Sequence, residues 1–297
     1  MAIRRTKTRV VFIVNPIAGN SHTELFPDFV KRVLNHNRFC YEIVFTEYAG
    51  HAIALGNEAA KSEFDLVVAV GGDGTINEVA RELIHSDKIL GIIPSGSGNG
   101  LARHLNIPLN FEGALRLINT GNQSKIDTAT INDRAFISIA GVGFDALVAE
   151  KFANDPNRGF LTYFKLAAAN YQSYQPETYT IIIDHKREIV AEALFISLAN
   201  SSQFGYNTTI APQAVLNDGL IDLCIVEKPT IFDMPLIANL LLLKMIHKSK
   251  FVTIHKARHV EIKRSGNRVV NIDGEPLMLE KDLVIDINPL SLNIIIP

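Results

Sequence analysis

The pattern that most constrains this chain is the alternation of apolar and amphipathic segments over its first third. Residues 10–14 (VVFIV), 66–71 (LVVAVG) and 89–94 (ILGIIP) are apolar at almost every position. Apolar runs of this kind are typical of parallel strands whose sheet is covered by helices on both faces. The intervening segments have the apolar spacing of helices: 25–37, 51–62 and 75–85. We therefore predict that residues 1–126 form an α/β domain with a parallel sheet.

The pattern of predicted secondary structure changes after residue 125. Residues 127–287 contain many short strand-like segments separated by turn signals, and helices are expected only near residues 161–173 and 233–248. This pattern predicts a second, mainly antiparallel domain, a β-sandwich. The final apolar segment, residues 288–297, is a candidate to return to the first domain.

Composition excludes several classes of protein. A net charge of -2 gives no global basic field, so no nucleic-acid partner is expected. Two cysteines, Cys40 and Cys224, are far apart and predict neither a metal cluster nor a disulfide framework, which favours a reducing cytoplasm. The longest apolar run, residues 235–246, is too short to span a bilayer and contains a lysine. The basic segment from Arg4 to Arg9 is either a solvated tail or a contact for an anionic membrane surface.

Glycine-bearing loops follow three of the predicted parallel strands. They are residues 15–20 (NPIAGN), 71–75 (GGDGT) and 94–100 (PSGSGNG), and the remaining strand of the domain ends at Thr46. Glycines allow the backbone to approach a phosphate, and a following helix N-terminus supplies unpaired N–H groups. Three such loops at one sheet edge predict a polyphosphate site. Taken alone, GGDGT is equally compatible with a tight turn in which Asp73 accepts from local amides.

The order of the motifs resembles a known family. VNPIAG, VVAVGGDGTINEV, GIIPSGSGNGLARHLNIP, AGVGFDA, LNDGLIDL and NIDGEPL occur in the order and at the spacing of the diacylglycerol and sphingosine kinases, and the chain is most similar to the bacterial soluble members. The GGDGT motif alone is shared with NAD kinases and resembles phosphofructokinases. The resemblance implies a first domain of the NAD kinase and phosphofructokinase type and a β-rich lipid-binding second domain.

The resemblance further implies that ATP binds at the strand ends of the first domain. The nucleotide and phosphate contacts carried over by motif are Asn15, Pro16, Ile17, Ala18, Gly19, Thr46, Gly72, Asp73, Gly74, Thr75, Ile76, Asn77, Glu78 and Ser97. An aspartate repels phosphate unless a cation or a proton lies between them. We therefore assign Asp73 to the organisation of Mg²⁺ and ATP, with a role as a base left open.

The late motif NIDGEPL reads as a hairpin with an Asp-Gly turn. In the family, the glutamate of this motif is the proposed general base, which makes Glu275 the candidate to accept the proton of a lipid hydroxyl. The family also implies a structural Mg²⁺ at residues 215–220, held by the Asp218 side chain and the backbone carbonyls of Val215 and Leu220. Asp127 is a candidate for a magnesium and water network, or is simply a residue at a strand end.

One position departs from the family pattern. Many bacterial diacylglycerol kinases have an acid after the asparagine of the fourth loop, where this chain has Gly100. The acceptor is therefore left open between diacylglycerol and a sphingoid-type alcohol. The expected protein is a cytoplasmic, peripheral lipid kinase that transfers the γ-phosphoryl group of ATP at a membrane surface, with the lipid entering between the domains, and a homodimer is left open. The alternatives are an NAD kinase acting on a soluble dinucleotide and a regulator that binds nucleotide or lipid without turnover.

Overall fold

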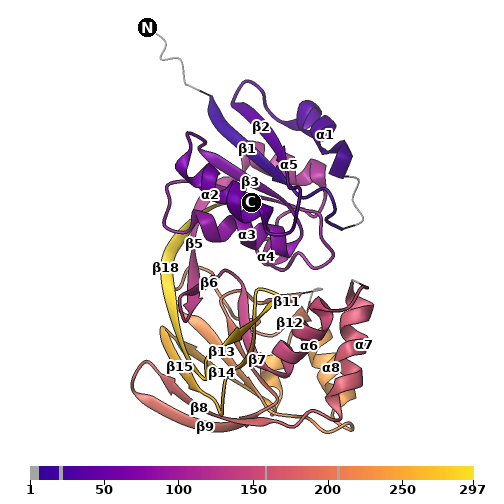
Figure 1. The fold of residues 1–297 in the computed structure, drawn as a ribbon, viewed down its shortest axis with the longest axis vertical. Helices are drawn as coiled ribbons and strands as arrows, with labels where there is room; N and C mark the ends of the chain where they lie inside the picture. The colour runs from indigo at the N-terminus through magenta and orange to yellow at the C-terminus, as the bar shows by residue number, and fades with distance from the viewer. Residues whose placement is uncertain (1–6, 20–22, 158, 206–207) are drawn as a thin grey trace. The chain divides into compact units, whose positions relative to one another are not determined.

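The chain forms two compact units in the computed structural model, which describes residues 7–19, 23–157, 159–205 and 208–297 (Figure 1). The first unit comprises residues 1–126 and 291–297, and the second comprises residues 127–290. Among the residues described, no helix combines the length and the hydropathy needed to cross a bilayer.

The first unit is built on parallel strands in the order β2-β1-β3-β4. Its elements are β1 (Thr8–Val14), η1 (Thr23–Leu25), α1 (Phe26–Val33), β2 (Phe39–Phe45), α2 (His51–Lys61), β3 (Leu66–Gly71), α3 (Asp73–Leu83), β4 (Ile89–Pro94), α4 (Gly100–His104) and α5 (Phe111–Thr120).

Helices cover both faces of this sheet. Side chains of β1 alternate in direction, yet Val11, Phe12 and Ile13 are all buried, so neither face is left to solvent. Helices α1 and α5 pack against one face through Phe26 and Leu115, and α2 and α3 pack against each other and contact β1 and β3. The parallel α/β prediction is therefore confirmed.

The second unit is mainly antiparallel. Its elements are β6 (Arg134–Phe136), β7 (Ile139–Gly143), α6 (Phe144–Ala153), α7 (Phe160–Tyr171), β8 (Glu177–Ile183), β9 (Arg187–Ala193), β10 (Phe195–Ala199), β11 (Gln203–Gly205), β12 (Thr208–Thr209), β13 (Ile221–Val226), α8 (Met234–Leu242), η2 (Ile246–Lys248), β14 (Val252–Ala257), β15 (His259–Lys263), β16 (Arg268–Ile272) and β17 (Glu275–Leu279). Two further strands, β5 (Asn122–Ile131) and β18 (Asp282–Ile296), have residues in both units.

Two sheets share one core in the second unit. One sheet has the order β14-β13-β10-β7-β16-β17, and the other contains β18, β15, β8 and β9 in that order. Val142 and Leu198 of the first sheet and Ile181 and Val260 of the second belong to the same buried cluster. A core shared by two antiparallel sheets is the defining feature of a β-sandwich, so this prediction is also confirmed.

The long strand β18 changes partners along its length. Residues Asp282–Asp286 pair antiparallel with β15, whereas Asn293 and Ile294 pair in parallel with Ile89 and Leu90 of β4. The apolar end of the chain thus forms part of the first unit's sheet, beside β4.

Candidate functional site

The glycine-bearing loops of the first unit lie at one edge of its sheet. Because β1, β2, β3 and β4 are parallel, their carboxyl ends meet there. Backbone hydrogen bonds continue past the strands: Thr46 N donates to Val14 O over 2.8 Å and Asn15 N donates to Val70 O over 2.9 Å. The segments predicted to bind phosphate therefore start from a fixed backbone platform.

Asp73 joins two of these loops. Its Oδ2 accepts from Asn99 N and its Oδ1 accepts from Gly100 N, both over 2.7 Å. Burial raises the pKa of the Asp73 carboxyl, and the hydrogen bonds from the Gly100 and Asn99 amides oppose that shift without cancelling it. The partners are 26 and 27 residues away, so Asp73 organises the fourth loop and not only its own turn.

Glycines permit the close approach of the loops. A Cβ atom on Gly98 would lie 2.6 Å from Asp73 Oδ2, and one on Gly96 would lie 2.6 Å from Gly72 Cα. A Cβ on Gly19, whose φ is +65°, would lie 1.9 Å from Ser95 O. Side chains at these positions would separate the loops, which explains why the sequence concentrates glycine here.

Asn15 connects the first loop to helix α3. Its Nδ2 donates to Thr75 Oγ1 over 3.0 Å, and its Oδ1 accepts from Ile17 N over 3.1 Å. The Ile17 side chain is 88% exposed. The first loop thus presents residues to solvent, while the hydrogen bonds of Asn15 fix the start of the loop.

The predicted nucleotide contacts divide into exposed and buried groups. Pro16, Ile17, Gly19, Gly74 and Ser97 are exposed, Asn15, Ala18, Thr46, Gly72, Asp73 and Glu78 are half-buried, and Thr75, Ile76 and Asn77 are buried. Ile76 is 1% exposed and its N–H donates to Gly72 O over 3.0 Å, which argues against the nucleotide contact expected for it. Asn20, in the same predicted loop, lies outside the described residues, as does the Arg4–Thr6 part of the basic N-terminal segment.

The second unit carries Glu275 on the predicted hairpin. Strands β16 and β17 pair antiparallel, with Ile272 opposite Glu275. The intervening residues, Asp273 and Gly274, have φ values of 52° and 89°, as a two-residue type I′ turn requires. Glu275 is the first residue of β17 and is exposed.

Side chains of Asp273, Asn271 and Asp145 hold this hairpin in place. Asp273 Oδ2 accepts from Ile137 N over 2.8 Å, and its Oδ1 accepts from Ser138 N and Ile139 N over 2.8 and 3.0 Å. The Asn271 carboxamide accepts from Gly274 N over 2.9 Å and donates to Asp145 Oδ2 over 2.9 Å. The backbone that presents Glu275 is thereby tied to two other segments of the sandwich.

The roles of Asn271, Asp273 and Asp145 were not predicted from the sequence. The Asp-Gly pair indicated the turn but not the three amides that Asp273 binds, and Asp145 reads only as a residue at a helix start. In the structure Asp145 lies in the first turn of α6, is buried, and accepts from Tyr163 Oη over 3.2 Å.

Asp145 makes the stability of the protein depend on pH. Burial raises the pKa of its carboxyl from 3.8 to about 6, and the hydrogen bonds from Asn271 and Tyr163 only partly oppose this shift. Between those values the folded chain holds a proton that the unfolded chain has released, so the stabilisation is fully present only below pH 3.8 and is lost as the pH rises through about 6. The loss amounts to about 3 kcal/mol.

We expect the Asp145→Asn substitution to remove this dependence. Guanidinium titrations give the free energy of unfolding of both proteins at about pH 4 and at about pH 7. The difference between variant and wild type should shift in favour of the variant by about 2–3 kcal/mol from the lower pH to the higher one. An offset between the two proteins that is equal at both pH values would contradict the assignment.

The expected magnesium residues lie on the turn before β13. Asp218 Oδ1 accepts from Leu220 N over 3.0 Å, and its Oδ2 lies 2.8 Å from Lys256 Nζ. Desolvation lowers the pKa of Lys256, but the carboxylates of Asp218 and Asp222 raise it by more. The net pKa is therefore above its usual value, and the ammonium stays charged. The carboxylate and carbonyl oxygens suit Mg²⁺. A lysine already neutralises the Asp218 carboxylate, however, so an ion there would have to displace or share it.

Asp127 packs against the same turn. It is fully buried, its Oδ2 accepts from Gly219 N, and its Oδ1 accepts from Leu290 N, each over 2.7 Å. These contacts give Asp127 a direct structural role at the 216–220 turn. Its participation in a magnesium network stays a prediction.

Comparisons with known proteins agree along most of the chain. Residues 9–131 match the model of the diacylglycerol kinase catalytic domain, and residues 138–296 match that of the YegS C-terminal NAD kinase beta sandwich-like domain. A protein named diacylglycerol kinase from Bacillus subtilis (strain 168) is 33% identical over 279 residues, which cover 90% of this chain and 89% of that protein. A second protein named diacylglycerol kinase, from Staphylococcus epidermidis, is 28% identical over 91% of this chain and 86% of that protein.

Solved structures show the same fold. A crystal structure of a diacylglycerol kinase from Bacillus anthracis (strain Sterne) superposes with a TM-score of 0.77 over 97% of both chains, at 21% identity.

Proposed function

Because this chain belongs to the diacylglycerol kinase family, we propose that it is an ATP-dependent lipid kinase that phosphorylates the hydroxyl of a lipid alcohol. The observation that carries the proposal is the sheet edge of the first unit, where three glycine-bearing loops converge and Asp73 binds two of them together. The substrate is diacylglycerol or a sphingoid-type alcohol.

In this proposal the first unit binds the nucleotide. The exposed residues Gly19, Gly74 and Ser97 would contact the phosphate oxygens, and the N-terminus of α3 would direct the positive end of its dipole at them. Mg²⁺, when bound, would neutralise the charge of the phosphates. Asp73 would hold it near the nucleotide, and Asp218 with the carbonyls of Val215 and Leu220 would hold a structural ion.

In the same proposal Glu275 of the second unit accepts the proton of the lipid hydroxyl. An alcohol attacks phosphorus well only when a base takes its proton as the new P–O bond forms. Glu275 is an exposed carboxylate on a hairpin that Asp273 and Asn271 fix, which are the properties expected of a positioned base. The oxygen of the alcohol then bonds to the γ-phosphorus, and ADP leaves.

A transfer assay tests the proposal against its alternatives. Purified protein is given γ-radiolabelled ATP with diacylglycerol, a sphingoid base or NAD, each in detergent micelles or solution as its solubility requires. Label in a lipid product supports the proposal and identifies the acceptor. Label in NAD would favour the NAD kinase alternative, and binding of ATP without transfer to any acceptor would favour a non-catalytic regulator.

We further propose that the lipid is reached from an anionic membrane through the region of α8. Ile231, Phe232, Leu236, Leu242 and Leu243 are exposed apolar side chains on or next to this helix. Lys244, Lys248 and Lys250, which follow it, are exposed as well. Apolar side chains bordered by lysines match the requirements of a surface that inserts between anionic headgroups.

The Phe232→Ser substitution should weaken binding to anionic vesicles about 10–100-fold, because a large apolar side chain removed from water contributes about 1.5–3 kcal/mol. Phe232 is 91% exposed, so its loss should leave the melting temperature unchanged. Co-sedimentation with vesicles measures the effect. Val190→Ser, at another exposed apolar position of the second unit, is the matched control, and equal binding by both variants would contradict the proposal.

A further inference from the structure

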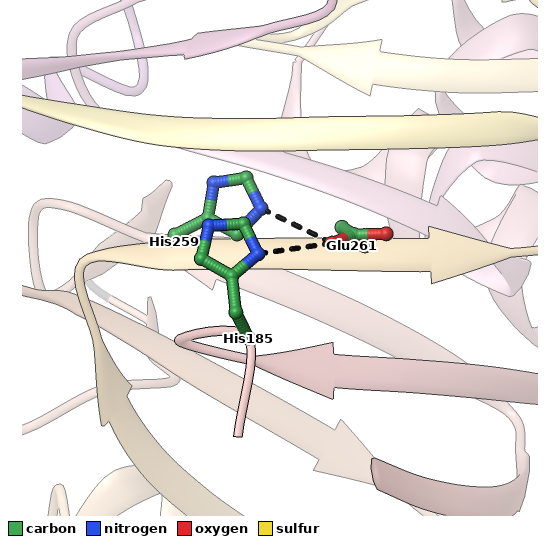
Figure 2. Close-up of side chains that lie close together, drawn as sticks. All are labelled: His185, His259 and Glu261. Carbon is green, nitrogen blue, oxygen red and sulfur yellow. Dashed lines mark hydrogen bonds and ion pairs between the residues drawn. The ribbon is translucent and has the colours of Figure 1, made fainter. Parts of the chain in front are cut away.

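Two histidines and a glutamate converge in the second unit, and none of them has a role in the proposed reaction. His185 follows β8, whereas His259 and Glu261 lie on β15. Figure 2 shows both imidazole rings directed at the Glu261 carboxylate. His185 Nδ1 lies 3.3 Å and His259 Nε2 lies 3.5 Å from Glu261 Oε1. We propose that His185, His259 and Glu261 form a binding site for a divalent transition metal, with Zn²⁺ as the best match.

The spacing of the donor atoms fits tetrahedral coordination. Ligands about 2.0–2.1 Å from Zn²⁺ are separated by about 3.3–3.4 Å along a tetrahedral edge. The two nitrogen-to-oxygen distances of 3.3 and 3.5 Å are of this length, and all three candidate atoms lie within 4.8 Å of one another. Small rotations of the side chains would bring them around one ion.

His259 is held in the orientation that a ligand needs. Its Nδ1 pairs with Asp286 Oδ1 over 2.7 Å, which leaves Nε2 directed at the cluster. Within the described part of the chain, this Nε2 is buried and makes no hydrogen bond of good geometry. A carboxylate on the far nitrogen of a histidine ligand is the common outer-shell arrangement of zinc sites, where it fixes the tautomer and strengthens the ligand.

His185 is fixed to the same strand by its neighbour. Asp184 and His185 form a turn between β8 and β9 with φ values of 49° and 56°. The Asp184 carboxylate accepts from Arg258 N and His259 N over 2.9 and 3.0 Å. The two imidazole rings stack with centroids 3.9 Å apart. The site therefore exists before any ion arrives, which lowers the cost of binding.

The donor set selects the class of ion. Two imidazole nitrogens and one carboxylate oxygen suit Zn²⁺ and similar metals, whereas Mg²⁺ prefers oxygen ligands alone. His259 and Asp286 also line a surface cavity of about 510 Å³. A bound ion would connect the turn between β8 and β9 to β15 and would keep a coordination position for water.

Equilibrium dialysis of untagged, chelator-treated full-length protein against Zn²⁺, with Mg²⁺ in excess to fill oxygen sites, tests this proposal. We expect one Zn²⁺ per chain in wild type. His185→Ala and His259→Ala should each weaken binding more than about tenfold, and Asp286→Asn should weaken it about 10–100-fold through the outer shell. His36→Ala, an exposed histidine of the first unit, should bind as wild type does.

A second readout is independent of dialysis. Zn²⁺ should raise the melting temperature of wild type and of His36→Ala but not of His185→Ala. Because His185 lies in an exposed turn, its replacement by alanine should leave the fold intact, so misfolding would not explain a missing response. Binding of Zn²⁺ by His185→Ala with wild-type affinity would overturn the proposal. Absence of Zn²⁺ binding by wild type would overturn it equally and would identify the cluster as a surface charge network.

Discussion

The Glu275→Gln protein should bind ATP as wild type does and lose phosphoryl transfer by about 10²–10⁴-fold in kcat, because a positioned general base contributes about that factor. Glutamine keeps the shape of the side chain but cannot accept the proton of the lipid hydroxyl. Since Glu275 is exposed at the start of β17, the substitution should not change the melting temperature. Transfer of label from ATP to the lipid acceptor measures the effect, and nucleotide binding is measured separately by titration.

Glu280→Gln is the matched control for this experiment. Glu280 is another exposed glutamate, just beyond β17, and should leave kcat unchanged. Transfer by the Glu275→Gln protein at the wild-type rate would remove Glu275 from the role of base. It would not affect the assignment of nucleotide binding to the first unit.

The Asp73→Ala substitution should lower both activity and stability. It leaves the buried amides of Asn99 and Gly100 without their acceptor, and each such loss costs about 1–3 kcal/mol, so we expect the free energy of unfolding to fall by about 2–6 kcal/mol. The fourth loop should shift, and a displacement of about 1 Å in a catalytic site can cost about a hundredfold in kcat/KM. Guanidinium titration and the transfer assay measure the two effects.

Two further variants separate the structural role of Asp73 from a role in binding Mg²⁺. Asp87→Ala removes an exposed aspartate of the same unit and should change stability by less than about 0.5 kcal/mol. In the Asp73→Asn protein, a higher Mg²⁺ concentration for half-maximal activity would support the metal role expected for Asp73. Reduced stability with an unchanged Mg²⁺ requirement would limit Asp73 to holding the loops, and wild-type stability in Asp73→Ala would contradict the structural argument.

The polar residues at the ends of the parallel strands were predictable because their positions follow from local patterns. Apolar runs separated by helical segments imply parallel strands, and parallel strands bring their carboxyl ends to one edge. That reasoning predicts that Asn15, Thr46 and Gly72 lie at the same edge of the sheet. The Asp-Gly pair at residues 273–274 predicted the hairpin for a similarly local reason, since both residues tolerate positive φ.

The partners of the buried side chains were not predictable in this way. Asp73 binds amides 26 and 27 residues away, and Asn271 donates to Asp145 across 126 residues. Such pairings depend on strand register and on which segments pack together, and no periodicity of 2 or 3.6 residues encodes them. The same holds for Lys256 beside Asp218, which the family motif gave no reason to expect.

The sequence by itself determined the two fold classes, the edge that carries the glycine-bearing loops and the hairpin that carries Glu275, because backbone preference and apolar periodicity are properties of short segments. Only the tertiary structure decided that Asp73 closes two loops, that Asp145 supports the Glu275 hairpin from the core, and that His185, His259 and Glu261 converge. Hydrogen bonds and ligand sets between distant residues come into being only when packing brings their atoms within about 3 Å.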